Sequence, residues 1–163
     1  MIGVFKRVHK PQLLATAIVA SLAAGVIGSF ATTTKIGSWY AELDKPLFNP
    51  PNWIFGPVWT TLYIMMGISL YLVWISRSDE SKKSAFITYG VQLALNTIWS
   101  LVFFGLEQPW AAFVVILLLI ASILLTMREF AKFNEISVYL LMPYLGWVAF
   151  ATYLNLGIAL LNT

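Results

Sequence analysis

Cysteine is absent from this sequence, and histidine occurs once, at His9, ahead of the first long apolar segment. Without cysteine there is no disulfide framework and no thiol chemistry. Zinc sites and the usual axial haem ligands are built largely from Cys and His side chains, and a Ser–His nucleophilic pair also needs histidine. These sites are therefore excluded from the apolar segments, and we expect no metal site and no required cofactor.

Charged residues are scarce as well, because they make up 10% of the 163 residues while hydrophobic residues make up 60%. A helix needs roughly 20 apolar residues to cross the hydrocarbon layer of a bilayer. Five uncharged segments have about this length: 13–34, 58–76, 84–106, 108–127 and 136–161. The sequence thus predicts an all-α membrane protein, a five-helix transmembrane bundle in which residues 1–163 form a single integral membrane domain. Ion- and proton-coupled carriers usually keep charged groups inside their spans, so their absence argues against a pump.

Basic residues lie mostly on one side of the predicted spans. With five spans, the N-terminus, the second loop and the fourth loop share one side, and the other side carries only Lys35 and Lys45. The basic residues of the first side are Lys6, Arg7, Lys10, Arg77, Lys82, Lys83, Arg128 and Lys132. In a bacterial inner membrane, the positive-inside rule predicts a cytoplasmic N-terminus and an external first loop. This bias accounts for the net charge of +3, so the charge does not indicate a nucleic-acid partner.

The connection between the first two spans is long and rich in aromatic residues. Residues 39–63 read WYAELDKPLFNPPNWIFGPVWTTLY and contain three Trp, two Tyr and four Pro. A connection that only joined two spans would be short and polar. We therefore expect the 39–57 loop to cover a pocket.

Helical periodicity places aromatic and amide side chains on common faces of three spans. The three stripes are Trp59, Tyr63 and Met66, then Gln92, Asn96, Trp99 and Phe103, and finally Trp147, Ala151 and Asn155. Aromatic faces with a few amides suit a large, flat, apolar ligand. Two simpler interpretations stay open: interhelical hydrogen bonds for the amides and an interfacial aromatic belt for the Trp residues. The belt suits Trp74 and Trp110 at span ends better than the deeper Trp99 and Trp147.

Small residues recur at a spacing of four in two spans, and a proline interrupts another. The two rows are Ser21, Gly25 and Ser29 in the first span, and Gly90 and Ala94 in the third. Such rows let helix backbones approach closely, either within the bundle or between two subunits. Pro143 lies about two turns inside the last span, where we expect it to kink the helix or open its backbone locally.

Three segments together resemble a known family: residues 39–63, QLALNTIWSLVFFG (92–105) and PYLGWVAFATYLN (143–155). They are similar to the tryptophan-rich sensory protein family, also called the translocator protein or peripheral-type benzodiazepine receptor family. With the matching spans, the resemblance covers residues 13–155, and three separated motifs make it highly specific. It points to a bacterial member.

The resemblance implies a five-helix bundle, usually a homodimer, whose first loop folds over a pocket between the helices. Members bind porphyrins such as protoporphyrin IX, and animal members also bind cholesterol and isoquinoline or benzodiazepine drugs. Carried over by motif position, the ligand-binding residues are Trp39, Trp53, Trp59, Tyr63, Asn96, Trp99, Trp147 and Ala151. From the placement of charge, we also expect Lys35 and Lys45 to meet porphyrin propionates at the pocket mouth.

The sequence therefore favours a receptor or regulator in the lipid bilayer that binds a tetrapyrrole. One alternative is a light-dependent porphyrin-degrading enzyme, in which the resemblance would make Trp59 and Trp147 the catalytic residues. Another is a passive transporter of tetrapyrroles or sterol-like lipids. The sterol-recognition pattern of animal members has Tyr followed by Lys or Arg, whereas this chain has Leu156 and Leu160 at those places. That departure disfavours sterol transport.

Overall fold

The computed structural model of the protein describes residues 10–163, and every regular element there is a helix. The expectations for Lys6, Arg7 and His9 lie outside the described residues. Within the described part, five helices are long and apolar enough to span a membrane. They are α1 (Pro11–Lys35), α3 (Phe55–Ile75), α4 (Lys83–Ser100) with its continuation η2 (Leu101–Gly105), α5 (Pro109–Ala131) and α6 (Glu135–Leu161). The first loop adds two short helices, α2 (Trp39–Glu42) and η1 (Asn52–Ile54).

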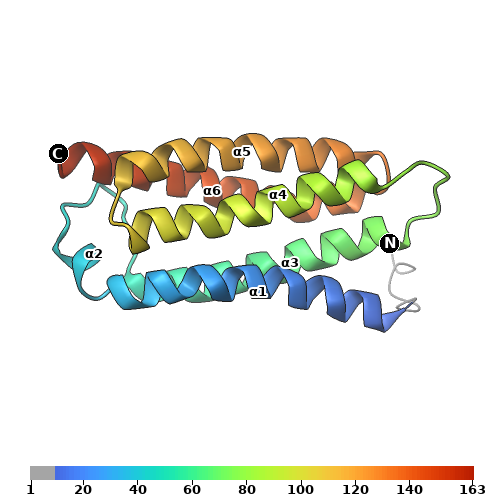
Figure 1. The fold of residues 1–163 in the computed structure, drawn as a ribbon, viewed down its shortest axis with the longest axis horizontal. Coiled ribbons are helices and arrows are strands. Elements are labelled where there is room, and N and C mark those ends of the chain that lie inside the picture. Colours follow the sequence, from blue (N-terminus) through green and yellow to red (C-terminus); the bar gives the residue numbers. More distant parts are fainter. Residues whose placement is uncertain (1–9) are drawn as a thin grey trace.

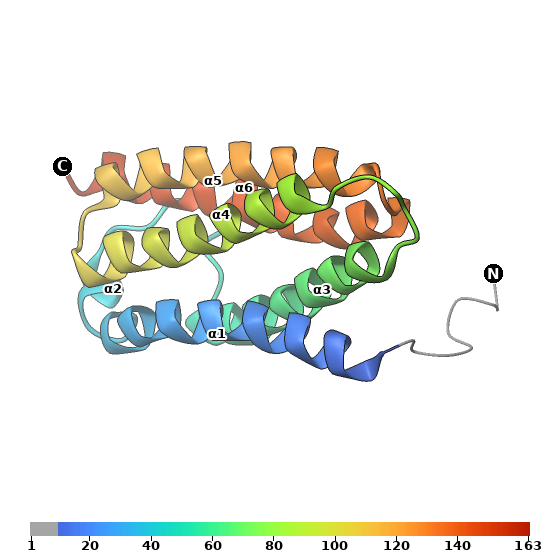
Figure 2. The same ribbon diagram turned by 45° about the vertical axis from the view of Figure 1, so that its right-hand side comes forward.

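The long helices pack side by side as a closed ring. Going around the ring, α1 packs on α3, α3 on α6, α6 on α5, α5 on α4, and α4 on α1. Figures 1 and 2 show this bundle, with α2 and the first loop at the same end as the C-terminus. The predicted five-helix bundle is confirmed.

Two helix boundaries differ from the predicted spans. The second span was expected to begin at residue 58, but α3 begins at Phe55 and contains Pro57 in its first turn. Proline fits there because the first N–H groups of a helix have no partner within it. The fourth span was expected to end at 127, but α5 continues through Arg128 and Glu129 to Ala131. A helix end can carry charges once it has left the apolar layer, so the first charge does not mark the helix end.

Local sequence signals explain where several helices begin. Pro11 and Pro109 stand at the first positions of α1 and α5, where the fixed φ of proline suits a helix and no N–H is lost. The side chain of Asn134 caps α6 by accepting hydrogen bonds from the N–H groups of Ile136 (2.9 Å) and Ser137 (3.3 Å). Pro143 lies inside α6, which continues on both sides of it from Glu135 to Leu161.

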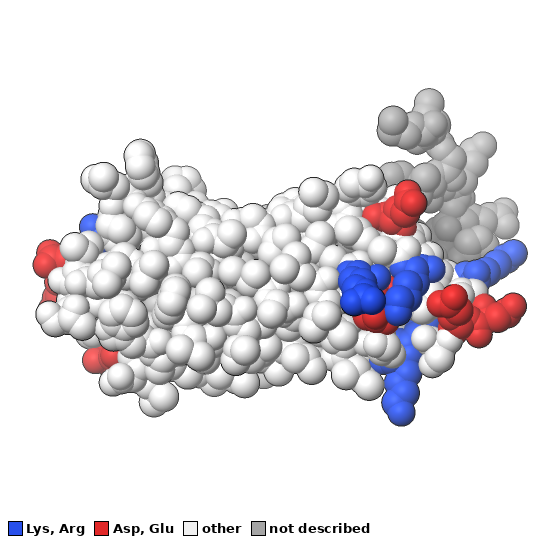
Figure 3. Space-filling view, turned by 90° about the horizontal axis from the view of Figure 1, so that it is seen from above, with Lys and Arg blue, Asp and Glu red and all other residues white. Residues whose placement is uncertain are grey.

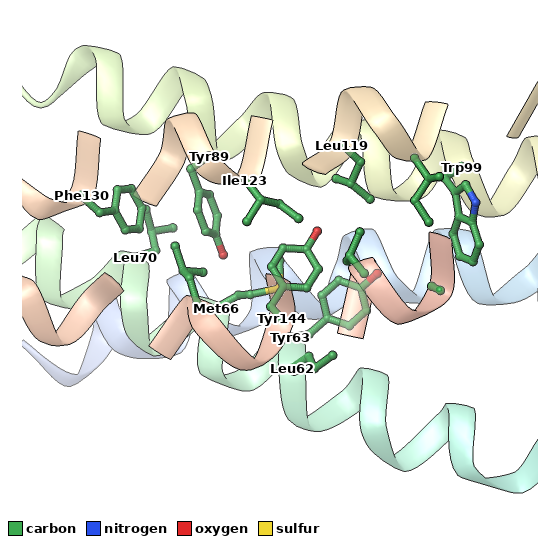
Figure 4. Packing of buried hydrophobic residues seen from close by; sticks show 14 of the residues in the cluster. Leu62, Tyr63, Met66, Leu70, Tyr89, Trp99, Leu119, Ile123, Phe130 and Tyr144 are labelled. Carbon is green, nitrogen blue, oxygen red and sulfur yellow. The ribbon is translucent and has the colours of Figure 1, made fainter. Parts of the chain in front are cut away.

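The core lies inside the ring and combines aromatic and aliphatic side chains (Figure 4). Met66, Phe130 and Tyr144 are completely buried. Tyr89 stacks on Phe130 with ring centroids 5.7 Å apart and planes within 12°. This packing fixes the positions of α3, α4, α5 and α6 around the polar groups described below.

The row of small residues on α1 packs inside the bundle. The hydroxyl groups of Ser21 and Tyr89 are 2.6 Å apart, and a Cβ at Gly25 would overlap the ring of Tyr63. The intramolecular interpretation is thus confirmed for these two positions. On α4, by contrast, the second row faces outward, and a Cβ at Gly90 would meet nothing within 4 Å.

Charged side chains lie at the two ends of the molecule. On the face shown in Figure 3, the middle of the bundle carries none. Among the described residues, the end with the α3–α4 and α5–α6 turns carries Arg77, Lys82, Lys83, Arg128 and Lys132, while the first-loop end carries Lys35 and Lys45. An uncharged band between two charged ends matches a bundle that crosses a bilayer.

Candidate ligand-binding cavity

A cavity of about 400 Å³ lies between α1, α3 and α4, next to the end of the first loop. Its size falls in the range of small-molecule sites, about 300–1,000 Å³. Five of the eight predicted ligand-binding residues line it: Trp53, Trp59, Tyr63, Asn96 and Trp99. Two separate segments of the sequence, 53–63 and 96–99, therefore meet at one space.

One wall of the cavity is a run of aromatic rings. Trp59 stacks on Tyr63 with centroids 5.7 Å apart and planes at 29°, and it lies 6.4 Å from Trp99 at 35°. Trp99 in turn stacks on Phe103 at 5.7 Å and 29°. These rings present flat apolar faces rather than the isolated, outward Trp side chains of an interfacial belt.

The end of α4 is a π-helical turn, which helps to shape this wall. The N–H of Leu106 donates to the carbonyl of Leu101, five residues earlier, at 2.9 Å. A π-turn widens the helix and is frequent at functional sites. Phe103 and Phe104 are consecutive, yet both are buried, with centroids 4.8 Å apart. Phe104 lines the cavity, so the π-turn adds a ring that a regular helical stripe would not predict.

A chain of buried hydrogen bonds begins at the cavity and continues into the core. The hydroxyl of Tyr63 donates to Oδ1 of Asn96 (2.8 Å), and Nδ2 of Asn96 donates to the hydroxyl of Tyr144 (2.9 Å). That hydroxyl donates to Oε1 of Gln92 (2.8 Å). Nε2 of Gln92 is buried and has no partner among the described residues. The chain links α3, α4 and α6 and holds the Asn96 amide against the cavity.

The side chain of Asn155 on α6 also forms hydrogen bonds to neighbouring helices. Its Oδ1 accepts a hydrogen bond from Nε1 of Trp99 (3.0 Å), and its Nδ2 donates to the carbonyl of Pro109 (2.8 Å). Interhelical hydrogen bonding is therefore confirmed for both Asn96 and Asn155. The bond from Asn155 meets the edge of the Trp99 indole and restricts its orientation in the cavity wall.

The first loop is fastened to itself and to α6. The hydroxyl of Tyr40 donates to Oδ1 of Asn49 at 2.8 Å. Burial raises the pKa of Tyr40 to about 12, although this hydrogen bond works in the opposite direction. Asn162, just after α6, holds the N–H and the carbonyl of Asp44 with Oδ1 (3.0 Å) and Nδ2 (2.9 Å). Only the last part of the expected 39–57 cover, residues 52–56, borders the cavity.

Lys35 and Lys45, which were expected to meet porphyrin propionates, both contact groups of the protein itself. Nζ of Lys35 lies 2.6 Å from Oε1 of Glu107. Nζ of Lys45 donates to the carbonyl of Leu43 (2.9 Å) and lies 5.1 Å from the centre of the Tyr40 ring. Neither lysine lines the cavity. The expected cation pair at the pocket mouth is therefore not preformed, because a carboxylate and backbone carbonyls of the protein already engage these charges.

Comparison with known proteins shows the family to which the sequence belongs. The sequence matches the model of the TspO/MBR family over residues 17–161. The chain belongs to the TspO/MBR family. It is 46% identical to the Tryptophan-rich protein TspO of Archaeoglobus fulgidus over 151 residues, which cover 91% of this chain and 96% of that protein. It is 42% identical to the Translocator protein of Homo sapiens over 120 residues, 72% of this chain and 70% of that one.

A bacterial relative supports the same conclusion. The Tryptophan-rich sensory protein of Cereibacter sphaeroides is 36% identical over 138 residues, 83% of this chain and 85% of that protein. The family predicted from the three motifs is confirmed. Membership of the TspO/MBR family and five span-length helices together make the chain an integral, multi-pass membrane protein.

In this TspO/MBR chain, three predicted ligand-binding residues lie outside the cavity. Trp39 packs edge-on against Phe103 with centroids 5.7 Å apart, and Ala151 is buried in the core. Trp147 packs edge-on against Phe55 at 6.1 Å. Phe55 itself lines the cavity, so Trp147 contacts a lining residue without lining the cavity. Helical periodicity correctly predicted that Trp147 and Ala151 share one face of α6. It could not predict which side chains of other elements contact that face.

Sequence reasoning also missed a whole wall of the cavity. α1 contributes Gly25, Gly28, Ser29 and Thr32. The row of small residues on α1 was the available signal, and we interpreted it only as helix packing. Small side chains both let α1 approach α3 and α4 and leave space beside them. Ser29, the last member of the row, is exposed at the rim of the cavity.

The chemistry available at this site comes from rings, amides and hydroxyl groups. Within residues 10–163, no three His, Cys, Asp or Glu side chains are grouped so that they could hold a metal ion. An aromatic wall with one held amide can bind a flat apolar molecule and orient it through a single polar group.

Proposed function

We propose that this TspO/MBR protein is a membrane receptor or regulator that binds a tetrapyrrole, such as protoporphyrin IX, in the cavity between α1, α3 and α4. The observation that carries the proposal is the continuous wall of Trp59, Tyr63 and Trp99 beside the fixed amide of Asn96. Stacking of aromatic rings contributes roughly 0.5–1.5 kcal/mol per pair beyond burial. Two indole faces therefore favour a flat conjugated ring over an aliphatic ligand of the same size.

The polar ends of the ligand would stay at the mouth of the cavity. A carboxylate that is buried without a partner loses its hydration at high cost, and no cation lines the cavity. The rim is formed by exposed residues of α1 and α3, including Ser29 and Thr60, and by Asn52 and Trp53 of the first loop. Propionate groups would therefore point out past Trp53 into water or lipid headgroups, while the ring lies against Trp59 and Trp99.

A titration of tryptophan fluorescence with protoporphyrin IX in the dark tests this function. We expect saturable quenching, and we expect Asn96→Ala to weaken binding about tenfold, which corresponds to about 1.4 kcal/mol. Trp59→Phe should also weaken binding. Trp110→Phe is the matched control, because Trp110 lies at the exposed start of α5 outside the cavity lining. Quenching that does not saturate, or that is equally affected by all three changes, would rule out this cavity as the tetrapyrrole site.

Two further measurements separate the alternative functions, one under illumination and one in liposomes. For a light-dependent enzyme, porphyrin absorbance would disappear only under illumination, and Trp59→Phe would stop the loss while keeping dark binding. Trp59 borders the cavity and Trp147 does not, so we expect Trp59 to matter more. A passive carrier would instead move porphyrin into liposomes down its gradient without consuming it.

We further propose that the N-terminus is cytoplasmic and that the protein is a homodimer. The basic residues at the end with the α3–α4 and α5–α6 turns support the orientation. The outward-facing small residues Gly90 and Ala94 of α4 support the dimer, since they would allow close approach of a second copy.

A further inference from the structure

The early part of the first loop runs down the outside of α6. Three contacts mark its path: Asp44 is held by Asn162, Pro46 packs on Gly157, and the carbonyl of Leu47 accepts a hydrogen bond from the hydroxyl of Tyr153 (2.9 Å). A Cβ at Gly157 would lie 2.6 Å from two atoms of the Pro46 ring. As the loop advances from 44 to 47, its partners on α6 recede from 162 to 153. The five helical residues from Asn162 to Gly157, on which Pro46 packs, correspond to about 7.5 Å along the helix axis, and the long side chain of Tyr153 covers the remaining distance to Leu47.

This path brings Leu47 to the level at which α5 enters the bundle. Asn155, two residues beyond Tyr153, donates to the carbonyl of Pro109 at the start of α5. The next residue, Trp110, is exposed at this helix end, which is the usual position of an interfacial tryptophan. The loop therefore does not stay in the water above the bundle, and its lowest part reaches the membrane interface.

The lowest part of the loop exposes large apolar side chains. Leu47 is 77% exposed and Phe48 is 85% exposed. Phe48 also has φ of 65°, an uncommon left-handed conformation for a bulky residue. Between Lys45 and Arg77 the sequence has no charged residue. An exposed Leu–Phe pair in an uncharged segment is costly in water and favourable against lipid.

The backbone of the same segment suits an apolar environment. Backbone N–H and C=O groups near hydrocarbon need partners, because lipid supplies none. Pro46, Pro50 and Pro51 have no N–H, and the carbonyl of Leu47 is satisfied by Tyr153. Three of six consecutive residues therefore bring no unpaired donor to the interface.

We propose that Leu47 and Phe48 form a membrane anchor, which inserts these two side chains between the headgroups and acyl chains of the adjoining leaflet. The partner is the lipid bilayer itself. The anchor lies five residues before Trp53, which lines the cavity, so it ties the end of the loop that borders the cavity to the membrane surface. This role of the loop is independent of which ligand the cavity binds.

Spin labelling tests the anchor directly, because the chain has no cysteine and each introduced cysteine carries the label alone. The variants are Phe48→Cys and Leu47→Cys in phosphatidylcholine nanodiscs. Ala41→Cys, exposed on α2 of the same loop, is the aqueous control, and Leu118→Cys, exposed in the middle of α5, is the lipid control. Collisions of the nitroxide with oxygen and with a water-soluble nickel chelate are measured by power saturation.

We expect the oxygen-to-nickel ratio at positions 47 and 48 to exceed that at 41 several-fold and to approach that at 118. A ratio at 48 equal to the ratio at 41 would overturn the proposal. Low access to both reagents with spin–spin broadening would also overturn it, since a second copy of the chain would then cover the pair. Leu47→Cys keeps the test decisive if Phe48→Cys does not fold.

Discussion

At the scale of single residues, Tyr144 does not line the cavity, yet its hydroxyl holds the Asn96 amide that does. It is fully buried, and its hydroxyl joins Asn96 to Gln92. Tyr144→Phe would leave the Asn96 amide and Oε1 of Gln92 each short of a partner, and each unsatisfied buried group costs about 1–3 kcal/mol. We expect a lower thermal unfolding temperature in nanodiscs and weaker porphyrin binding with unchanged stoichiometry.

The matched control for Tyr144 is Tyr139→Phe. Tyr139 is 65% exposed and lies five residues earlier on α6, so loss of its hydroxyl should change neither quantity. If both variants unfold at the wild-type temperature, the hydrogen-bond chain does not stabilise the bundle in the way argued here.

Residue patterns predicted the members of the cavity that lie on one helix face, and they failed where another element intervenes. Trp59 with Tyr63, and Asn96 with Trp99, follow from spacing alone, and the structure brings both pairs to one wall. Trp147 has equally good spacing, but it packs against Phe55 and does not line the cavity. The spacing of residues predicts the direction in which a side chain leaves its own helix. The residue that contacts that side chain, here Phe55 against Trp147, depends on the path of the first loop.

At the scale of elements, two glycines of α6 provide a test of how the first loop is held. A Cβ at Gly157 would overlap the ring of Pro46, while a Cβ at Gly146 on the same helix would meet nothing within 4 Å. Glycine inside a helix is less favourable than alanine by roughly 0.5–1 kcal/mol. We expect Gly146→Ala to raise the unfolding temperature and Gly157→Ala not to, because its added methyl group displaces the loop.

Hydrogen–deuterium exchange of residues 43–54 gives the second readout for these two variants. Gly157→Ala should speed exchange in this segment, and Gly146→Ala should leave it at the wild-type rate. Equal stabilisation by both changes, with no difference in exchange, would show that the contact between Pro46 and Gly157 does not position the loop.

The elements themselves were predictable because each span is a long uncharged run with recognisable ends. Pro109 opens α5 and Asn134 caps α6. The π-turn at Leu101–Gly105 was not predictable, since its residues fit a regular helix equally well. In the structure, its consecutive residues Phe103 and Phe104 are both buried and in contact.

At the scale of the whole molecule, the order of helices around the ring is set by contacts that hydropathy does not encode. Five apolar helices could close into several different rings. Here the close approach of α1 to α3 depends on glycines, with Gly25 against Tyr63 and Gly67 against Ile18. The hydrogen bond from Thr97 to the carbonyl of Ala24 joins α1 to α4. Neither the span pattern nor the five-helix bundle implied by the resemblance specified this order.

The proposed orientation of the bundle in the membrane rests on the difference between its two ends. The first-loop end carries Glu42, Asp44 and Glu107 beside its two lysines, and Lys35 is already paired with Glu107. The opposite end keeps the larger number of Lys and Arg, and such ends stay in the cytoplasm. We predict that Gly37→Cys, exposed after α1, reacts with a membrane-impermeant maleimide in intact bacterial spheroplasts. Asp79→Cys, exposed in the α3–α4 turn, should react only after the membrane is opened, and the reverse pattern would show that charge does not set the topology.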